Sequence, residues 1–367
     1  MWRIMRPDAE RIWKNKEILS RFSRYFAIIN KEKIARYLIT KKVPISIKID
    51  SSIPTDKLWD EHEHTAGKFN ALLRELDEHQ NPIKYYKTLD SPQASFLDLK
   101  IELALRILRN CHFCERGCSV NREEEKGTCR LGAKSYVSSW FHHMGEEPPL
   151  IPSGTIFFES CCFKCVFCQN YDISQKPSWT VAVDGRKLAA IANELARERV
   201  KNINYVTPLP NTYVIIESFK YQTENITQLW NSNHYCSKET MKLILELMDF
   251  WLPDFKYYVD SHAERYSKVK NFFETVSRNH KLVHDKGSGE MIIRHLVMPD
   301  HVECCTKPIL EWIAENTPKA VVNIMGQYRP AYQAHKYSEI NRRPTGKEMK
   351  EAREFATKLG ILWEPVS

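Results

Sequence analysis

Residues 153–170, with the sequence SGTIFFESCCFKCVFCQN, guide the interpretation of the whole chain. The stretch begins as a short apolar run around a glycine, which is typical of a buried strand. It continues as a loop in which Cys161, Cys165 and Cys168 have the spacing C-x3-C-x2-C. Thiolates are soft ligands suited to iron–sulfur clusters and zinc. A [4Fe-4S] cluster normally has four cysteine ligands, so three from one loop leave one iron open to another molecule.

Two other interpretations of this loop are a zinc knuckle and a set of buried free thiols. Cys162 lies outside the spacing and is expected to pack in the interior. A non-catalytic electron carrier would be expected to close its coordination shell with a further ligand. The open three-cysteine pattern therefore favours an enzyme over a carrier.

The composition limits the class of protein. The chain has 367 residues and a net charge of +8, a mild excess that does not indicate nucleic-acid binding. Eight of the eleven cysteines lie between Cys111 and Cys168, which favours metal binding over a disulfide framework. No apolar run is long enough to cross a bilayer, and residues 1–6 lead into no signal-peptide core. We expect a cytoplasmic protein without membrane association.

A second cysteine group precedes the first. Its spacing, with a glycine-containing return, predicts a closed site for one metal or cluster, formed by Cys111, Cys114, Cys118 and Cys129. Zinc and a second iron–sulfur cluster both fit four thiolates, and unliganded structural cysteines are the alternative. A closed site of this kind would be structural or electron-carrying.

Residues 142–149 join the two cysteine groups through a turn that contains Glu146 and Glu147. These carboxylates are candidates to face the cysteine loop, because the turn directly precedes the apolar strand. His142 and His143 are candidates for metal ligation or proton transfer, although histidines in such loops are more often simply hydrogen-bonded.

The remainder of the chain alternates strands and helices, which indicates a parallel sheet. After the first strand we expect strands at 202–207, 227–231, 250–257, 291–298 and 320–325, and helices at 188–200, 213–220, 238–248, 271–284, 308–316 and 348–359. About six strand–helix units predict an α/β fold with a partial (β/α)6 barrel at 151–367. The segment 109–150 is then a metal-binding insert before the first strand. Residues 1–108 form a mostly helical extension, with helices within 9–35, 65–76 and 96–108 and a short strand at 43–49.

Barrels of this type carry their chemistry at the C-terminal strand ends. That rule selects Thr207, Asn231, Asp254, Lys256, Arg294 and Gln327. Arg294 can hold a carboxylate bidentately, Asp254 can accept from a hydroxyl or an ammonium group or bind a cation, and Lys256 can offset negative charge. For Asp254 and Arg294 the alternative is a strand-end salt bridge.

Together these segments resemble the uncharacterised relatives of pyruvate formate-lyase activating enzyme, a family of radical S-adenosylmethionine (SAM) enzymes. The resemblance covers about residues 109–360 and leaves the N-terminal hundred residues unexplained. It rests on the upstream cysteine group with Asn121 and Arg122, the cysteine loop and its continuation to Gln175, and the segments 145–149, 155–158, 202–208, 252–257, 293–296 and 325–328.

The resemblance implies one catalytic [4Fe-4S] cluster, with SAM at its open iron. Asp254 and Lys256 match an Asp-x-Lys segment at the SAM pocket, and Arg294 matches a strand arginine that contacts SAM. The Gly-Gly-Glu segment that usually holds the SAM amino group is absent, so Asn204 or Thr207 is expected to substitute for it. Cys162 stands where relatives usually have a polar residue.

The implied reaction begins when a one-electron donor such as ferredoxin or flavodoxin reduces the cluster. SAM is then cleaved to a 5′-deoxyadenosyl radical, which abstracts hydrogen from a substrate. No catalytic residue beyond the cluster ligands is needed. In the activating enzymes the substrate is a glycine of a partner protein, and a small metabolite, lipid or RNA is the alternative target. The alternative from another class of protein is a non-catalytic iron–sulfur electron carrier or a binding module.

Overall fold

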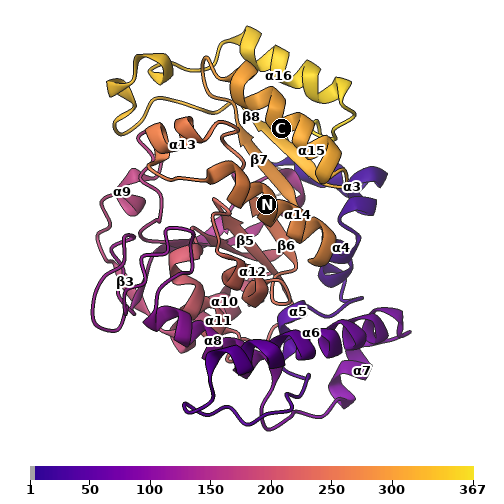
Figure 1. Cartoon of the computed structure of the whole chain (residues 1–367). Helices are drawn as coiled ribbons and strands as arrows, with labels where there is room; N and C mark the ends of the chain where they lie inside the picture. The colour runs from indigo at the N-terminus through magenta and orange to yellow at the C-terminus, as the bar shows by residue number, and fades with distance from the viewer. Residues whose placement is uncertain (1–4) are drawn as a thin grey trace.

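The computed structural model describes residues 5–367, and residues 1–4 of the predicted N-terminal extension lie outside the described part. The strands form a six-stranded sheet in the order β3-β1-β2-β4-β5-β6 and a two-stranded sheet, β7-β8 (Figure 1). Their bounds are β1 (Ser135–His143), β2 (Ser153–Phe158), β3 (Val181–Val183), β4 (Asn202–Val206), β5 (Thr227–Ser232), β6 (Phe250–Pro253), β7 (Ile292–Leu296) and β8 (Val321–Met325).

The strands from β2 onward, β3 excepted, run parallel. β2, β4, β5 and β6 pair in parallel register, as do β7 and β8. Two isolated parallel bridges, Trp251 to Met291 and Asp254 to Arg294, connect β6 to β7. Six parallel strands therefore follow one another, which confirms the predicted partial barrel. All six residues of β5 are buried, as expected for a parallel strand covered on both faces.

A helix follows each parallel strand and covers the outside of the sheet. These helices are α10 (Gly185–Arg197), α11 (Thr212–Ser218), α12 (Lys238–Ile244), α14 (Phe272–Lys286), α15 (Lys307–Asn316) and α16 (Gly346–Lys358). Local side chains define several of their starts: Asp184 caps α10, Ser237 caps α12, and Thr345 and Glu348 form a capping box on α16.

The sequence-based expectation missed β1 and β3. Both pair antiparallel at the edge of the sheet, and β1 lies inside the segment predicted as a metal-binding insert. Buried and partly exposed residues do not alternate regularly along β1. Its sequence therefore lacks the alternation of apolar and polar residues that identifies a half-buried strand. The expected strand at 43–49 is wrong, because that stretch contributes only an isolated bridge between Pro44 and Ser95. The division into segments at 108 and 150 stays a prediction.

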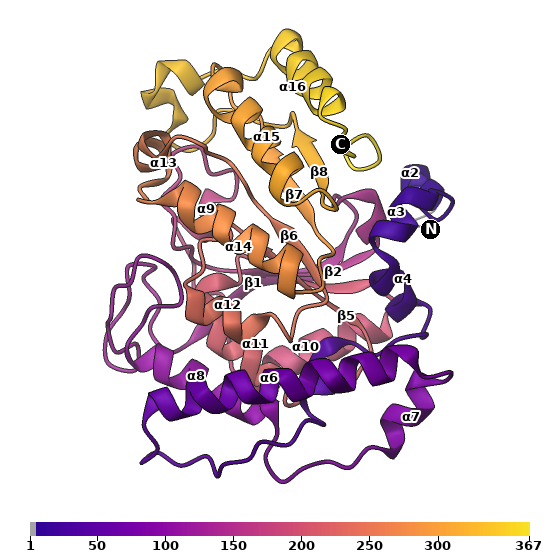
Figure 2. The same cartoon turned by 45° about the vertical axis from the view of Figure 1, so that its right-hand side comes forward.

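The N-terminal region is helical as predicted and packs on two sides of the barrel (Figure 2). On the inner side, the rings of Phe22 and Tyr25 lie 4.9 and 5.0 Å from that of Phe250 on β6. On the outer side, α8 packs against α11 and α12. The helices are α2 (Pro7–Ile12), α3 (Lys16–Arg21), α4 (Ser23–Ile29), α5 (Arg36–Thr40), α6 (Thr55–Glu78), α7 (Pro82–Thr88) and α8 (Phe96–Arg109). No helix in the described part of the chain has the length and apolar character to span a membrane.

The Glu290 carboxylate connects α4 to the segment that leads into β7. Its oxygens accept hydrogen bonds from the N–H groups of Arg24 (2.7 Å) and Tyr25 (2.8 Å), in the first turn of α4. Glu290 is 5% exposed, and this burial raises its pKa to about 7. The protonated form is therefore favoured in the folded protein relative to the unfolded chain.

We expect the stability contribution of Glu290 to fall as the pH rises from about 4.5 to about 7. A raised folded-state pKa means that the contribution is complete below the unfolded pKa and is lost through the folded pKa. Over this window, the free energy of unfolding of wild type should fall relative to Glu290→Gln by about 3 kcal/mol. Urea denaturation at a series of pH values measures the difference, with the exposed Glu124→Gln as control. A difference that does not change with pH would contradict the expectation.

Candidate active site

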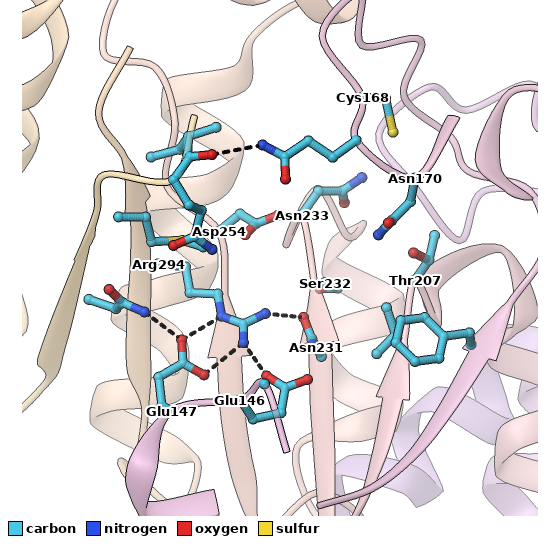
Figure 3. A pocket seen from close by; sticks show the side chains of 18 of the residues that line it. Glu146, Glu147, Cys168, Asn170, Thr207, Asn231, Ser232, Asn233, Asp254 and Arg294 are labelled. Carbon is cyan, nitrogen blue, oxygen red and sulfur yellow. Dashed lines mark hydrogen bonds and ion pairs between the residues drawn. The ribbon is translucent and has the colours of Figure 1, made fainter. Parts of the chain in front are cut away.

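A cavity of about 680 Å³ lies at the C-terminal ends of the parallel strands (Figure 3). The cysteine loop forms one side of it, and strand-end side chains form the others. All three cysteines of the C-x3-C-x2-C spacing line the cavity, as do six of the polar residues selected by the strand-end rule: Thr207, Asn231, Asp254, Lys256, Arg294 and Gln327. The structure thus brings these separate predictions together in one place. Asn204 is not among the lining residues and is buried below the cavity wall.

Each sulfur of the cysteine loop has a hydrogen-bond donor close by. Cys165 Sγ lies 3.0 Å from Ser267 Oγ, and Cys168 Sγ lies 3.1 Å from Ser174 Oγ. Cys161 Sγ accepts from the N–H of Phe163 at 3.3 Å and from Asn233 Nδ2 at 3.8 Å. Donors to sulfur stabilise the thiolate form and are among the features that tune iron–sulfur clusters.

The three thiols differ in how easily they ionise. A hydrogen bond with Cys162 lowers the pKa of Cys161 to about 7, and the N–H of Phe163 and the charge of Lys164 assist against the effect of burial. Burial raises the pKa of Cys165 to about 12 and also raises that of Cys168. Metal binding requires the deprotonated form, so a bound cationic group would have to supply the charge that ionises these two.

The sulfurs of the loop are spread more widely than the ligands of a single zinc ion. Zn–S bonds of about 2.3 Å place tetrahedral sulfurs about 3.8 Å apart. Among the described residues, the one triplet of His, Cys, Asp or Glu donor atoms within 4.8 Å of one another lies elsewhere, at His262, Cys304 and Cys305. The cavity sulfurs therefore fit a polynuclear cluster better than a zinc knuckle.

Two residues at or beside the cavity adopt the left-handed backbone region. Ser160, directly before the cysteine loop, has φ +76°, and Thr207, directly after β4, has φ +60°. This conformation is uncommon for residues other than glycine and is strained for a β-branched side chain such as threonine. The N–H of Thr207 donates to the carbonyl of Asn231 at 3.1 Å, which holds the strained turn against the end of β5.

Arg294 forms an ion pair with two carboxylates on the floor of the cavity (Figure 3). Its Nε and Nη2 donate to the two oxygens of Glu147, both at 2.7 Å, and Nη2 also contacts Glu146. Its Nη1 donates to Asn231 Oδ1 at 3.3 Å. Arg294 therefore does form a salt bridge, which was the alternative to contact with SAM. Its partners belong to the 142–149 turn and not to a neighbouring strand end. Two carboxylates against one guanidinium leave a net negative charge.

The carboxylate of Glu146 is fixed from several sides. Burial raises its pKa, but the charge of Arg294 and the neighbouring His143, whose Nδ1 lies 3.3 Å from Glu146 Oε1, outweigh burial and lower the pKa to about 2. Asn204 Nδ2 donates to Glu146 Oε1 at 3.0 Å, so Asn204 supports the cavity floor from below. Of the two candidate histidines, His143 lines the cavity, whereas His142 pairs with the partly exposed Glu198 at 2.6 Å.

Asp254 and Lys256 lie together at the end of β6 and pair with one another. The N–H of Asp254 donates to the carbonyl of Ser232 at 2.9 Å, which continues the parallel pairing beyond the strand. Both side chains line the cavity. The predicted acidic and basic groups therefore both reach the cavity, where each neutralises the charge of the other.

The upstream cysteine group packs against the cysteine loop. The thiols of Cys114 and Cys162 are hydrogen-bonded to one another, so Cys162 packs in the interior as expected and also joins the two groups. Arg116 donates to the carbonyl of Cys162, and Arg130 Nη2 donates to the carbonyl of Ser174 at 2.7 Å. These contacts fix the backbone of the cysteine loop and of the short helix, residues 171–174, that follows it.

Gly127 sits against two sulfurs of the upstream group. A Cβ at this position would lie 3.3 Å from Cys118 Sγ and 3.6 Å from Cys129 Sγ. A glycine therefore keeps space free beside these sulfurs. No three of the four upstream donor atoms fall within 4.8 Å of one another in the described conformation.

Sequence reasoning did not find Ser267 and Asn233, two of the donors to the cavity sulfurs. Neither belongs to a motif, and each reaches the cysteine loop from a different strand–helix connection. Ser174 lies within the stretch that carries the family resemblance, which is a signal that could have indicated it. The pairing of Glu146 and Glu147 with Arg294 was also not foreseen, because 147 residues separate Arg294 from Glu147.

Comparison with known proteins agrees with this geometry. Residues 155–313 match the radical SAM superfamily, a span that includes the cysteine loop, Asp254 and Arg294. The chain belongs to the radical SAM superfamily. Uncharacterized protein MJ0674 of Methanocaldococcus jannaschii is 41% identical over 352 residues, which cover 93% of this chain and 98% of that protein. Membership implies a [4Fe-4S] cluster, SAM, a one-electron reductant and SAM-dependent radical chemistry.

Solved structures show only a remote likeness to this chain. Streptococcus suis SuiB bound to precursor peptide SuiA has a TM-score of 0.41 and 15% identity, over 54% of this chain and 43% of that chain. TYW1 with a lysine-pyruvate adduct bound has a TM-score of 0.34 and 14% identity, over 55% of this chain and 73% of that chain. At this distance neither structure indicates the substrate of this chain.

Proposed function

We propose that Cys161, Cys165 and Cys168 hold a [4Fe-4S] cluster at which this chain cleaves SAM reductively, and that the resulting 5′-deoxyadenosyl radical takes hydrogen from a protein glycine. The observation that carries the proposal is the convergence of these three sulfurs on a cavity that strand-end polar groups also line. They are the only cysteines among the described residues that line it. One iron is then left for SAM.

The chain's own residues bind and orient the reactants in this proposal. When bound, the cluster supplies the electron that breaks the SAM sulfonium bond to the 5′ carbon. Ser174, Asn233 and Ser267 hold the cysteine sulfurs by hydrogen bonds. Apolar side chains such as those of Leu296 and Met325 form part of the wall and exclude water from the reacting centre.

The strand-end polar groups are proposed to contact SAM. Thr207 and Gln327 offer oxygens to its amino group and ribose hydroxyls, and Asp254 with Lys256 offers one charge of each sign. Arg294 is already bound to two carboxylates, so its contact with the SAM carboxylate is made alongside them. The buried Asn204 acts through Glu146.

An anaerobic activity assay tests the reaction. The protein is reconstituted with iron and sulfide and mixed with dithionite and SAM, and 5′-deoxyadenosine is measured by liquid chromatography. Its formation is expected. Its absence from protein with a full iron content would overturn the proposal and favour an electron carrier or binding module. A ferredoxin or flavodoxin is proposed as the natural donor and should replace dithionite.

The substrate class is tested by hydrogen transfer. A protein glycine is proposed because the sequence resembles the activating enzymes. Extracts of cells grown on Cα-deuterated glycine are separated into macromolecular and small-molecule fractions and added to the assay. Deuterium in 5′-deoxyadenosine from the protein fraction is the expected result. Deuterium that comes with small metabolites, lipids or RNA would overturn the glycine assignment and leave the SAM cleavage intact.

We also propose that the upstream cysteines Cys111, Cys114, Cys118 and Cys129 hold a second iron–sulfur cluster. The spacing of their sulfurs, no three of which lie within 4.8 Å of one another, supports a cluster over one zinc ion. The triple variant Cys161→Ala, Cys165→Ala, Cys168→Ala is therefore expected to retain iron and sulfide. Zinc alone in that variant would contradict the proposal. Adding Cys114→Ala should reduce solubility or stability.

A further inference from the structure

Three soft donor atoms meet outside the cavity, between α13 (Asp260–Ser267) and the π-helix Val302–Thr306 that follows β7. His262 Nδ1 lies 3.4 Å from Cys305 Sγ and 3.9 Å from Cys304 Sγ. All three donor atoms lie within 4.8 Å of one another, and no other such triplet occurs among residues 5–367. None of these three residues lines the cavity in which the cluster and SAM are proposed to bind.

The spacing of these atoms matches a tetrahedral zinc ion. Zn–N and Zn–S bonds of about 2.0 and 2.3 Å imply an N···S separation of about 3.5 Å. The observed separations of 3.4 and 3.9 Å lie on either side of that value. The donors therefore need only small adjustments to bind one ion.

The local backbone explains how adjacent cysteines reach one point. In the π-helix, the N–H groups of both Cys305 and Thr306 donate to the carbonyl of His301 at 3.1 Å. This widened turn changes the direction of the side chains, and such π-turns are frequent at functional sites. Cys305 is buried, and Cys304 is partly exposed, which leaves a path for an ion to enter.

The surroundings of His262 hold its ring in place. The His301 ring packs edge-on against that of His262, with centroids 4.6 Å apart. A hydrogen bond of 2.5 Å between His301 Nδ1 and the carbonyl of Pro299 fixes the ring of His301.

We propose that His262, Cys304 and Cys305 form a mononuclear zinc site, with solvent at the fourth position. Two thiolates and one imidazole are soft and borderline ligands of the type that selects zinc over magnesium or calcium. Both thiol protons pass to solvent when the ion binds. The site does not depend on the proposed SAM chemistry and is tested without it.

The position of the site gives it a structural consequence for the cysteine loop. α13 carries His262 in its first turn and ends at Ser267, whose hydroxyl contacts Cys165. The carbonyls of Tyr266 and Ser267 accept hydrogen bonds from Val166 (2.8 Å) and Lys164 (3.0 Å) of that loop. A zinc ion would join α13 to the segment after β7. In both views α13 lies close to α9 (Tyr171–Ser174), which follows the cysteine loop (Figures 1 and 2).

Metal content provides the first test. The full chain is prepared anaerobically, dialysed against buffered zinc and analysed by mass spectrometry of the elements. Wild type is expected to hold one more zinc per chain than His262→Gln or the double variant Cys304→Ser, Cys305→Ser. The matched controls Cys236→Ala and His284→Ala remove a cysteine and a histidine elsewhere, and should keep the wild-type content. Equal zinc in all proteins would overturn the proposal.

A second measurement on wild type does not depend on the folding of a variant. Cobalt(II) added to the zinc-free protein should give thiolate charge-transfer absorption, and zinc should displace it. Peptide mapping after iodoacetamide treatment should show Cys304 protected when zinc is present and alkylated when zinc is removed. Alkylation that zinc does not change would overturn the site, as would a Cys304–Cys305 disulfide in protein kept anaerobic and reduced.

Discussion

Replacing Cys165 by alanine is expected to reduce SAM cleavage to background while the protein stays folded. The change removes one of three thiolates that face the cavity, and two cysteines from one loop do not hold a cluster that leaves one iron free. The lost packing is small, since the substitution removes one sulfur atom that contacts Ser267 Oγ at 3.0 Å. We expect the free energy of unfolding to fall by about 1 kcal/mol. The measurements are 5′-deoxyadenosine formation and urea denaturation under anaerobic conditions.

Cys236→Ala is the matched control for this substitution. Cys236 is also buried, but it lies outside the cavity. This variant should keep the wild-type rate of 5′-deoxyadenosine formation and the wild-type iron content. Full cleavage by the Cys165 variant would show that the cluster ligands have been assigned incorrectly.

Arg294→Gln is expected to produce the largest loss of stability among the cavity variants. Glu146 and Glu147 are 5% and 4% exposed, and Arg294 is the guanidinium paired with both. Removal of one partner from a buried ion pair leaves uncompensated buried charge, which costs about 3–5 kcal/mol. Glu146 should bear much of this cost, because its low pKa depends on the charge of Arg294. Urea denaturation at neutral pH measures the loss.

Two comparisons separate this effect from loss of an ordinary ion pair. Arg342→Gln removes an arginine that is 37% exposed and pairs with Asp300 and Glu348 near the surface. This substitution should lower the free energy of unfolding by about 1 kcal/mol or less. Combining Glu146→Gln and Glu147→Gln with Arg294→Gln should recover part of the stability, since the buried charges are then absent. If Arg294→Gln costs no more than Arg342→Gln, the carboxylates are not held as the structure indicates.

Local patterns made most of the barrel predictable. The stretch at 227–231 was expected to be a strand and corresponds to β5, and the helices that follow each strand fall close to their expected positions. β1 and β3 were not foreseen because their identity as strands depends on antiparallel partners distant in the sequence. The stretch at 43–49 has the alternation of a strand, but it finds no neighbouring strand to complete its hydrogen bonds.

The sequence by itself determined the cysteine loop and the set of strand-end residues, because ligand spacing and the direction of parallel strands are local properties. Only the tertiary structure decided which groups meet these residues. It paired Arg294 with Glu146 and Glu147, brought Ser267 and Asn233 to the cavity sulfurs, and joined His262 on α13 to two cysteines after β7. These contacts connect segments far apart in the chain. They are set by how the helices and strands pack, which spacing within a single segment does not encode.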